Sequence, residues 1–249
     1  MVYNKMAGVY DRFMENAPYD QWTSFTKELL TIYQPNPNAI IDLGCGTGQI
    51  TLLLAKLGFE MTGVDFASDM LSIAQQRASE ENIAVQWIQQ DLNALETGKT
   101  YDVAISYCDV MNYITKEDEL QQVFSNVYQT LSKEGLFLFD VHAISYVEND
   151  LQDNTFSEMY EDMGYVWFCD AGTYHGEMYH DMTFFVKDKE QYERFDEQHH
   201  QRTFPTKDYL TWLRNVGFDI IGICSDFDTT FISPEQADQS QRIFIICRK

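Results

Sequence analysis

The hydrophobic and polar positions between residues 21 and 141 follow two periods. Apolar residues three or four apart predict helices, and short continuous apolar runs predict buried strands. A helical stripe through Trp22, Phe25 and Leu29 leads this region. The elements expected next are a strand at 39–43, a helix at 48–57, a strand at 60–65 and a helix that opens after Ser68.

The same alternation continues to residue 141. Strands are expected at 84–89, 101–107 and 135–141, with an amphipathic helix at 117–131. Thr115 is placed to cap the start of that helix, and Gly135 lies just past its end. Such alternation of strands and helices predicts an α/β fold, with a parallel sheet covered by helices on both faces.

The pattern changes after His142. Three runs, at 164–174, 177–188 and 191–204, look like strands separated by glycine and charged turns, which predicts an inserted antiparallel meander. Downstream, Thr206 is expected to cap a helix that Gly217 ends. Two final apolar runs, 219–225 and 242–249, are expected to complete the main sheet as a hairpin.

Composition and charge exclude several classes of protein. Apolar residues make up 45% of the 249 residues, and the formal net charge is −22, so nucleic acid would be repelled. Neither a membrane-spanning run nor a signal peptide is recognisable, which favours a soluble, cytoplasmic protein that does not bind membranes. Five scattered cysteines without a C-x-x-C pair favour reduced thiols over disulfides or structural zinc. The acidic 143–200 segment leaves two interpretations open, solubility alone or an amine-bearing partner.

Three glycines follow the first strand in the stretch DLGCGTG, at positions 44, 46 and 48. Glycine permits positive φ and lets a ligand approach bare backbone at the N-terminus of the next helix. A dinucleotide site would space its glycines as G-x-G-x-x-G, but here the third such position is Gln49. The spacing G-x-G-x-G therefore indicates a different nucleoside-containing ligand.

The DLGCGTG stretch resembles the first motif of the class I S-adenosylmethionine-dependent methyltransferases, small-molecule branch. The resemblance implies a Rossmann-like seven-stranded, mostly parallel sheet with its last strand antiparallel, and S-adenosyl-L-methionine as cofactor. In that family an acid after the second strand binds the ribose, and an acid after the third binds the adenine amine. The cofactor-binding residues that the resemblance implies are Tyr10, Gly44, Cys45, Gly46, Gly48, Asp65, Phe66, Asp91, Leu92 and Cys108.

Each of these positions also has a purely structural interpretation. An Asp at a strand end often serves only as a turn residue or a helix cap, and Asp69 is assigned to a first helical turn. Asp42, just before the glycines, is expected to orient the loop. Tyr10 lies in VYDRFM, similar to the stretch that heads small-molecule methyltransferases, where a tyrosine helps close the site; packing of the first helix would explain it equally well.

Two residues are candidates for the catalytic step. His142 follows the fifth strand, near the place expected for the acceptor, and histidine is the side chain best suited to take a proton near pH 7. Tyr10 is the second candidate. His199 and His200 are adjacent on a predicted strand, so they point to opposite faces and no metal site is expected.

These observations predict a domain that binds S-adenosylmethionine, residues 1–142 and 201–249, and an inserted lid or substrate-binding subdomain, residues 143–200. Aromatic residues of the insertion are expected to wall the acceptor pocket, although they would equally suit internal packing or a homodimer contact. The predicted activity is methyl transfer to nitrogen or oxygen of a small-molecule acceptor. The alternatives are a non-catalytic S-adenosylmethionine sensor or scaffold, and an RNA or protein methyltransferase; YCDVMNYI at 107–114 lacks the N-P-P-Y motif of amino-group methylation on nucleobases.

Overall fold

The structure, a computed structural model, describes residues 13–14, 17–34 and 36–249. A seven-stranded sheet has the order β10-β11-β5-β4-β1-β2-β3, and a separate four-stranded sheet has the order β6-β7-β8-β9. The strands of the larger sheet are β1 (Ala39–Leu43), β2 (Glu60–Asp65), β3 (Gln86–Gln89), β4 (Tyr101–Ser106), β5 (Leu131–His142), β10 (Asp219–Ser225) and β11 (Arg242–Arg248).

The larger sheet is mostly parallel. β1 pairs in parallel with β2 and β4, and β2–β3 and β4–β5 are also parallel. Only β11 runs the other way, antiparallel to both β5 and β10. The predicted fold class, including the antiparallel last strand, is confirmed.

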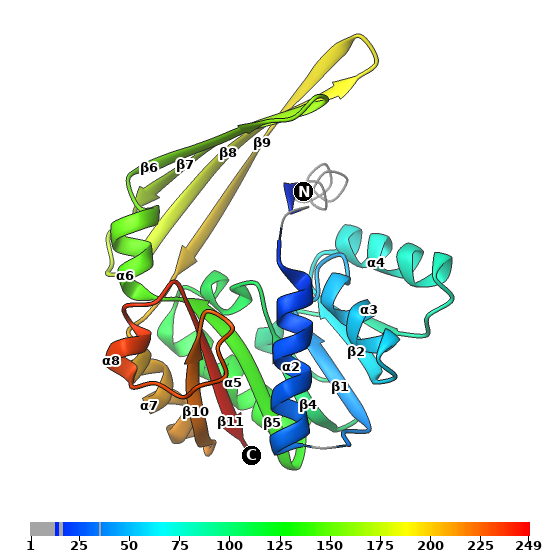
Figure 1. Cartoon of the computed structure of the whole chain (residues 1–249), viewed down its shortest axis with the longest axis vertical. Coiled ribbons are helices and arrows are strands. Elements are labelled where there is room, and N and C mark those ends of the chain that lie inside the picture. Colours follow the sequence, from blue (N-terminus) through cyan, green and yellow to red (C-terminus); the bar gives the residue numbers. More distant parts are fainter. Residues whose placement is uncertain (1–12, 15–16, 35) are drawn as a thin grey trace.

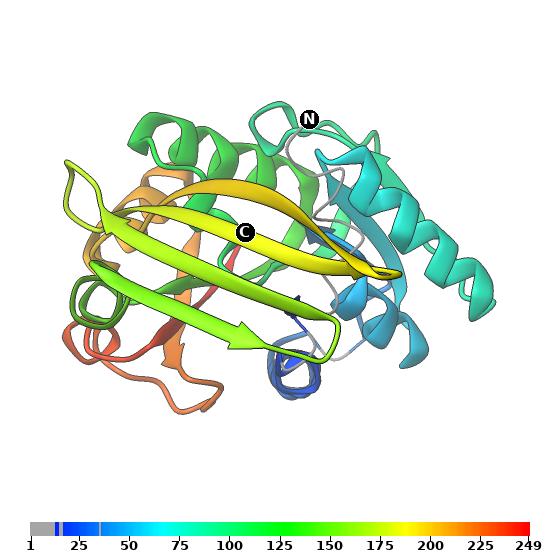
Figure 2. The same ribbon diagram turned by 90° about the horizontal axis from the view of Figure 1, so that it is seen from above.

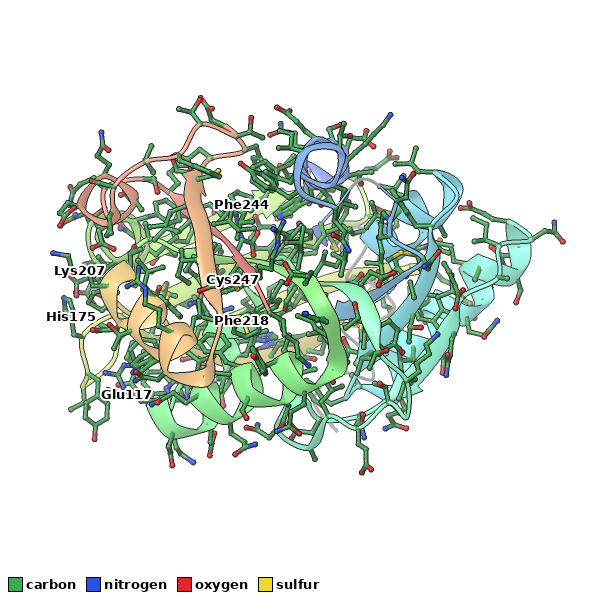
Figure 3. All side chains as sticks on the ribbon, turned by 90° about the horizontal axis from the view of Figure 1, so that it is seen from below. Glu117, His175, Lys207, Phe218, Phe244 and Cys247 are labelled. Carbon is green, nitrogen blue, oxygen red and sulfur yellow. The ribbon has the colours of Figure 1, made fainter. Side chains whose placement is uncertain are left out.

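Helices cover both faces of this sheet (Figure 1). The main ones are α2 (Tyr19–Tyr33), α3 (Gln49–Lys56), α4 (Ser68–Glu80), α5 (Glu117–Thr130) and α7 (Thr206–Val216). One core cluster joins α5 and α7 to the sheet, and a second joins α2 and α3 to its other face. Seen from below (Figure 3), Phe244 lies on the α2 side, whereas Phe218 and Cys247 lie on the side of α5 and α7.

Three local expectations about helix ends differ from the structure. Lys116, not Thr115, precedes α5, and no side chain caps that helix. β5 begins directly after α5, so Gly135 lies inside a strand that extends further back than its apolar run. Thr206 is the first residue of α7, and its hydroxyl donates to Asp238 Oδ1 at 2.6 Å because the short helix α8 (Pro234–Ala237) packs beside it.

The chain leaves the larger sheet after β5 and forms the insertion. Two short helical turns, α6 (Ile144–Tyr146) and η3 (Val147–Leu151), lead into the smaller sheet, called sheet B. Its strands are β6 (Asn154–Met159), β7 (Met163–Ala171), β8 (Glu177–Asp188) and β9 (Gln191–Arg202), and all its pairings are antiparallel. Sheet B extends over the end of the larger sheet (Figure 1) and lies across it from above (Figure 2). The polar, exposed strand β6 has no apolar run, which explains why only three strands were expected.

No helix in the described ranges is long and apolar enough to cross a membrane.

A buried hydrogen bond attaches α2 to the sheet. Trp22 Nε1 donates to Asp140 Oδ2 of β5 at 2.6 Å, and both side chains are buried. A bond to a buried carboxylate is stronger than one between neutral groups. It therefore fixes the position of α2 beyond what apolar packing alone would do.

We expect Trp22→Phe to destabilise the protein by about 1–3 kcal/mol, because it removes the donor to Asp140 while keeping an aromatic ring. Trp212→Phe in α7 replaces another buried indole by the same smaller ring and is the matched control. Urea unfolding measures both. Equal losses in the two variants would mean that the bond to Asp140 adds no stability.

Candidate active site

A cavity of about 360 Å³ lies between the carboxyl ends of the parallel strands and the inner side of sheet B. Its wall includes residues from the glycine loop, from the ends of β2, β4 and β5, and from sheet B. Of the predicted site residues, those that line it are Gly44, Cys45, Gly46, Asp65, Phe66, Cys108 and His142. Segments more than 150 residues apart along the chain, such as Gly44 and Gln201, thus meet at one place.

The glycine loop presents bare backbone to this cavity. Gly44, Gly46 and Gly48 all have positive φ, at 79°, 53° and 78°. A Cβ on Gly44 would lie 2.5 Å from Val110 Cγ1, whereas a Cβ on Gly46 would meet nothing within 4 Å. Gly44 is therefore required by packing, and Gly46 leaves open space where a ligand can approach the chain.

Asp65, at the end of β2, holds the loop in place. Its Oδ2 accepts from Gly46 N at 2.8 Å and its Oδ1 accepts from Ala67 N at 2.9 Å. Burial raises the pKa of Asp65, and these backbone donors oppose that shift. Each carboxylate oxygen keeps further acceptor capacity toward the cavity.

Asp42 adds a second carboxyl at the floor of the cavity. Thr51 Oγ1 donates to Asp42 Oδ2 at 2.5 Å. Burial and, to a smaller extent, the negative charge of Asp65 raise the pKa of Asp42 to about 7 against the lowering effect of the hydrogen bond from Thr51. A cationic ligand in the cavity would therefore displace the proton that Asp42 partly retains near pH 7.

The structure does not bring every predicted residue into this wall. Asp91 is exposed, and its Oδ1 accepts from Asn93 N at 2.8 Å in a local turn. Leu92 packs against the core instead of lining the cavity. Gly48 precedes α3 beside the cavity-lining Gln49. Tyr10 lies outside the described residues. The cofactor roles of all ten residues that the resemblance implied stay predictions, including those that line the cavity.

A largely buried ion-pair network joins Asp109, which follows β4, to β5 and β11. Arg242 Nη1 contacts Asp140 Oδ2 at 3.0 Å and Nη2 contacts Asp109 Oδ1 at 3.1 Å. Burial alone would raise the pKa of Asp109, but His142 and Arg242 outweigh it and hold the pKa at about 2. Arg242 and Asp140 were not among the residues predicted for the site. Asp140 is the one charge in the apolar run LFLFDV at 136–141, and Arg242 directly precedes the apolar run IFIIC at 243–247, and that was the available signal.

His142 lies beside this network and lines the cavity. Its Nε2 is 3.5 Å from Asp109 Oδ1, and its buried Nδ1 has no hydrogen-bond partner among the described residues. Burial lowers the pKa of His142 to about 4. The ring is therefore neutral at pH 7 and carries one open nitrogen.

Sheet B contributes a second polar wall. Its inner side brings Trp167, His180, Met182, His199 and Gln201 to the cavity. His200 points away from the cavity, as expected for a residue adjacent to His199 on the same strand. Its Nε2 lies 2.8 Å from Glu177 Oε1. Within the described ranges, no group of three or more His, Cys, Asp or Glu could hold a metal ion.

The aromatic residues of the insertion divide between its two sides. Trp167 lines the cavity, while Tyr165 and Phe184 pack with Phe13. Phe168, Tyr174, Tyr179 and Phe185 are exposed. Of these seven aromatic residues of the insertion, Trp167 alone lines the cavity that the structure describes.

Comparisons with known proteins match this geometry. Residues 40–135 match a family model described as a methyltransferase domain. YqeM of Bacillus subtilis (strain 168), named as a methyltransferase with no stated substrate, is 40% identical over 251 residues, covering 100% of this chain and 98% of YqeM. This chain belongs to the class I S-adenosylmethionine-dependent methyltransferases.

Solved structures extend the likeness to the insertion. An S-adenosylmethionine-dependent methyltransferase from Clostridium acetobutylicum ATCC 824 has a TM-score of 0.88 and 26% identity, covering 99% of this chain and 98% of that chain. CalS10 of Micromonospora echinaspora, an amino pentose methyltransferase with S-adenosylmethionine bound, has a TM-score of 0.78 and 15% identity, covering 97% of each chain. At that identity CalS10 shows the shared fold alone.

The cavity of this methyltransferase suits S-adenosylmethionine. Gly46 leaves room beside the backbone, Asp65 places acceptor oxygens at the end of β2, and the carboxyl of Asp42 favours a cation once it is ionised. The bound cofactor supplies a methyl group already activated on a sulfonium. The protein's residues then have to hold an acceptor in line and shield it from water.

Cofactor affinity is expected to rise with pH. Asp42, with its pKa near 7, is partly protonated below that value, and a cationic ligand favours the ionised form, so binding releases protons. We expect S-adenosylmethionine to bind about three- to tenfold more tightly at pH 8 than at pH 6. Calorimetry in two buffers of different ionisation enthalpy counts the protons. Asp42→Asn should flatten the profile, and an unchanged profile in that variant would exclude Asp42 as the source.

Asp65→Ala is expected to weaken cofactor binding by about 1–3 kcal/mol, because it removes the acceptor oxygens and releases Gly46. Asp69→Ala, in the first turn of α4, removes a carboxyl four residues away and is the matched control. Calorimetric titration compares the two. Equal affinities for Asp65→Ala and the control would contradict the cofactor role of Asp65.

Proposed function

We propose that this methyltransferase transfers a methyl group to a nitrogen or oxygen atom of a small-molecule acceptor. The observation that supports this most is the cavity of about 360 Å³, whose lining extends from the glycine loop to His142 and to sheet B. A mostly apolar cavity with a few polar groups suits a small ligand. CalS10, which shares the fold across the insertion, is named for an amino pentose, a small molecule.

His142 supplies the polar group that such an acceptor needs. An amine or hydroxyl that attacks the methyl group loses a proton, and its N–H or O–H must be oriented before attack. His142 is neutral at pH 7 and its Nδ1 is open, so it can accept a hydrogen bond from the acceptor. With a pKa near 4, it orients the acceptor more effectively than it stores a proton. Tyr10 stays a second proposed catalytic residue.

Two other predicted functions find less support. A net charge of −22 disfavours RNA. A non-catalytic sensor is disfavoured because the chain belongs to an enzyme family.

The decisive experiment measures release of S-adenosylhomocysteine over panels of small amines, alcohols, phenols and thiols, with bulk tRNA and a denatured protein extract as further substrates. We expect turnover with members of the amine, alcohol or phenol panels. Turnover confined to thiols, tRNA or protein, or none at all, would overturn the proposal.

With an acceptor from that panel, His142→Asn should lower kcat about 10- to 100-fold, because the acceptor loses its orienting partner. Cofactor affinity should change little. His175→Asn, an exposed histidine of the insertion that pairs with Glu148, is the control. If both variants keep wild-type kcat, His142 has no part in the transfer step.

A further inference from the structure

The side chain of Asp109 is the point where the insertion, the last strand and His142 meet. Gln201 Nε2 of β9 donates to Asp109 Oδ2 at 2.9 Å. Arg242 Nη2 donates to Oδ1 at 3.1 Å, and His142 Nε2 lies 3.5 Å from the same oxygen. Asp109 is thus contacted from sheet B on one oxygen and from the larger sheet on the other.

A series of hydrogen bonds leads from Trp167 through His180 and Gln201 to Asp109, and the chemistry of the side chains fixes which group donates in each. The indole of Trp167 can only donate, and its Nε1 lies 3.0 Å from His180 Nδ1, so that nitrogen accepts. The proton of neutral His180 is then on Nε2, which donates to Gln201 Oε1 at 3.0 Å. Gln201 is left with its NH₂ group toward Asp109. Side chains from β7 and β8 therefore fix the orientation of the Gln201 amide on β9.

The carboxylate also decides where the proton of His142 lies. Ionised Asp109 only accepts hydrogen bonds, so it favours a proton on the ring nitrogen that faces it, Nε2. The other nitrogen, Nδ1, is buried and then keeps its lone pair without a hydrogen-bond partner among the described residues. A contact of 3.5 Å is long for a hydrogen bond, and such contacts in active sites often shorten when the reactants bind.

We propose that Asp109 is a positioning residue, which holds His142 in the tautomer with an open Nδ1, and that Gln201 makes this alignment depend on the docking of sheet B. The proposal rests on the proposed function, because it is the acceptor that the open nitrogen would orient. A misdocked lid would then leave Asp109 held by Arg242 alone, and His142 less well oriented.

Nuclear magnetic resonance of the full chain, labelled with ¹⁵N-histidine and saturated with S-adenosylhomocysteine at pH 7, reports which ring nitrogen carries the proton. The His142 signals are assigned by their loss in His142→Asn. In the wild type we expect the Nε2–H form to exceed the Nδ1–H form by at least about tenfold. This readout needs no acceptor.

Asp109→Gly removes the carboxylate and suits the left-handed backbone of residue 109, whose φ is 52°. We expect it to reduce the preference for Nε2–H to within about fivefold. Asp109→Asn, also tolerated at positive φ, gives the same direction with a smaller shift if the glycine variant does not fold. An unchanged tautomer ratio in the folded variant overturns the role of Asp109, as does a wild type with its proton on Nδ1.

Gln201→Ala tests the link to sheet B, and the chain offers a matched control. Gln198, on the same strand but the opposite side, donates to Asp181 Oδ1 at 2.7 Å. Gln201→Ala should reduce the ratio of the Nε2–H to the Nδ1–H form of His142 at least about threefold, and Gln198→Ala should leave this ratio unchanged. Equal spectra from the two variants would overturn the role of Gln201. Failure of the acceptor panels overturns the proposed function alone, since the tautomer is measured without them.

Discussion

The buried guanidinium of Arg242 is the group on which the geometry of the site depends. It contacts Asp109 after β4 and Asp140 on β5, and Asp140 in turn accepts from Trp22 of α2. Removing one partner of a buried ion pair leaves an uncompensated charge, which costs far more than the pair itself contributes. The ends of β4, β5, β11 and α2 are therefore held in one arrangement. A shift in any of them would break an ion pair or a hydrogen bond to a charged group.

Two carboxyls of the site, those of Asp109 and Asp42, differ in how their charge is balanced. The guanidinium of Arg242 matches the charge of Asp109, whose pKa is lowered to about 2 against the effect of burial. Asp42 has the carboxyl of Asp65 nearby instead, and burial raises its pKa to about 7. One carboxyl is thus fixed as a structural anion, while the other is ready to lose its proton to a cationic ligand. Both states follow from the same fold.

The features that could be predicted from the sequence are those that a few neighbouring residues determine. The apolar runs of β1 and β2 and the glycines between β1 and α3 each carry their signal within a few residues. The contact between Asp109 and Arg242 joins positions 133 residues apart, and no periodicity encodes it. The family resemblance also could not foresee that the side chain of Asp91 would bond to Asn93 in its own turn. Local rules thus located the glycine loop, whereas the polar network around His142 required the tertiary structure.

The inner wall of sheet B depends on strand register more than on composition. β8 and β9 pair without a shift from Glu177 opposite Arg202 to Asp188 opposite Gln191, and Lys189 in the turn has a φ of 57°. Because side chains alternate, a slip of one residue would place His200 in the wall instead of Gln201. The two-residue turn therefore decides which amide reaches Asp109. Asn112 and Tyr113, which follow β4, add hydrogen bonds to β9, so the docking of this strand is also held close to Asp109.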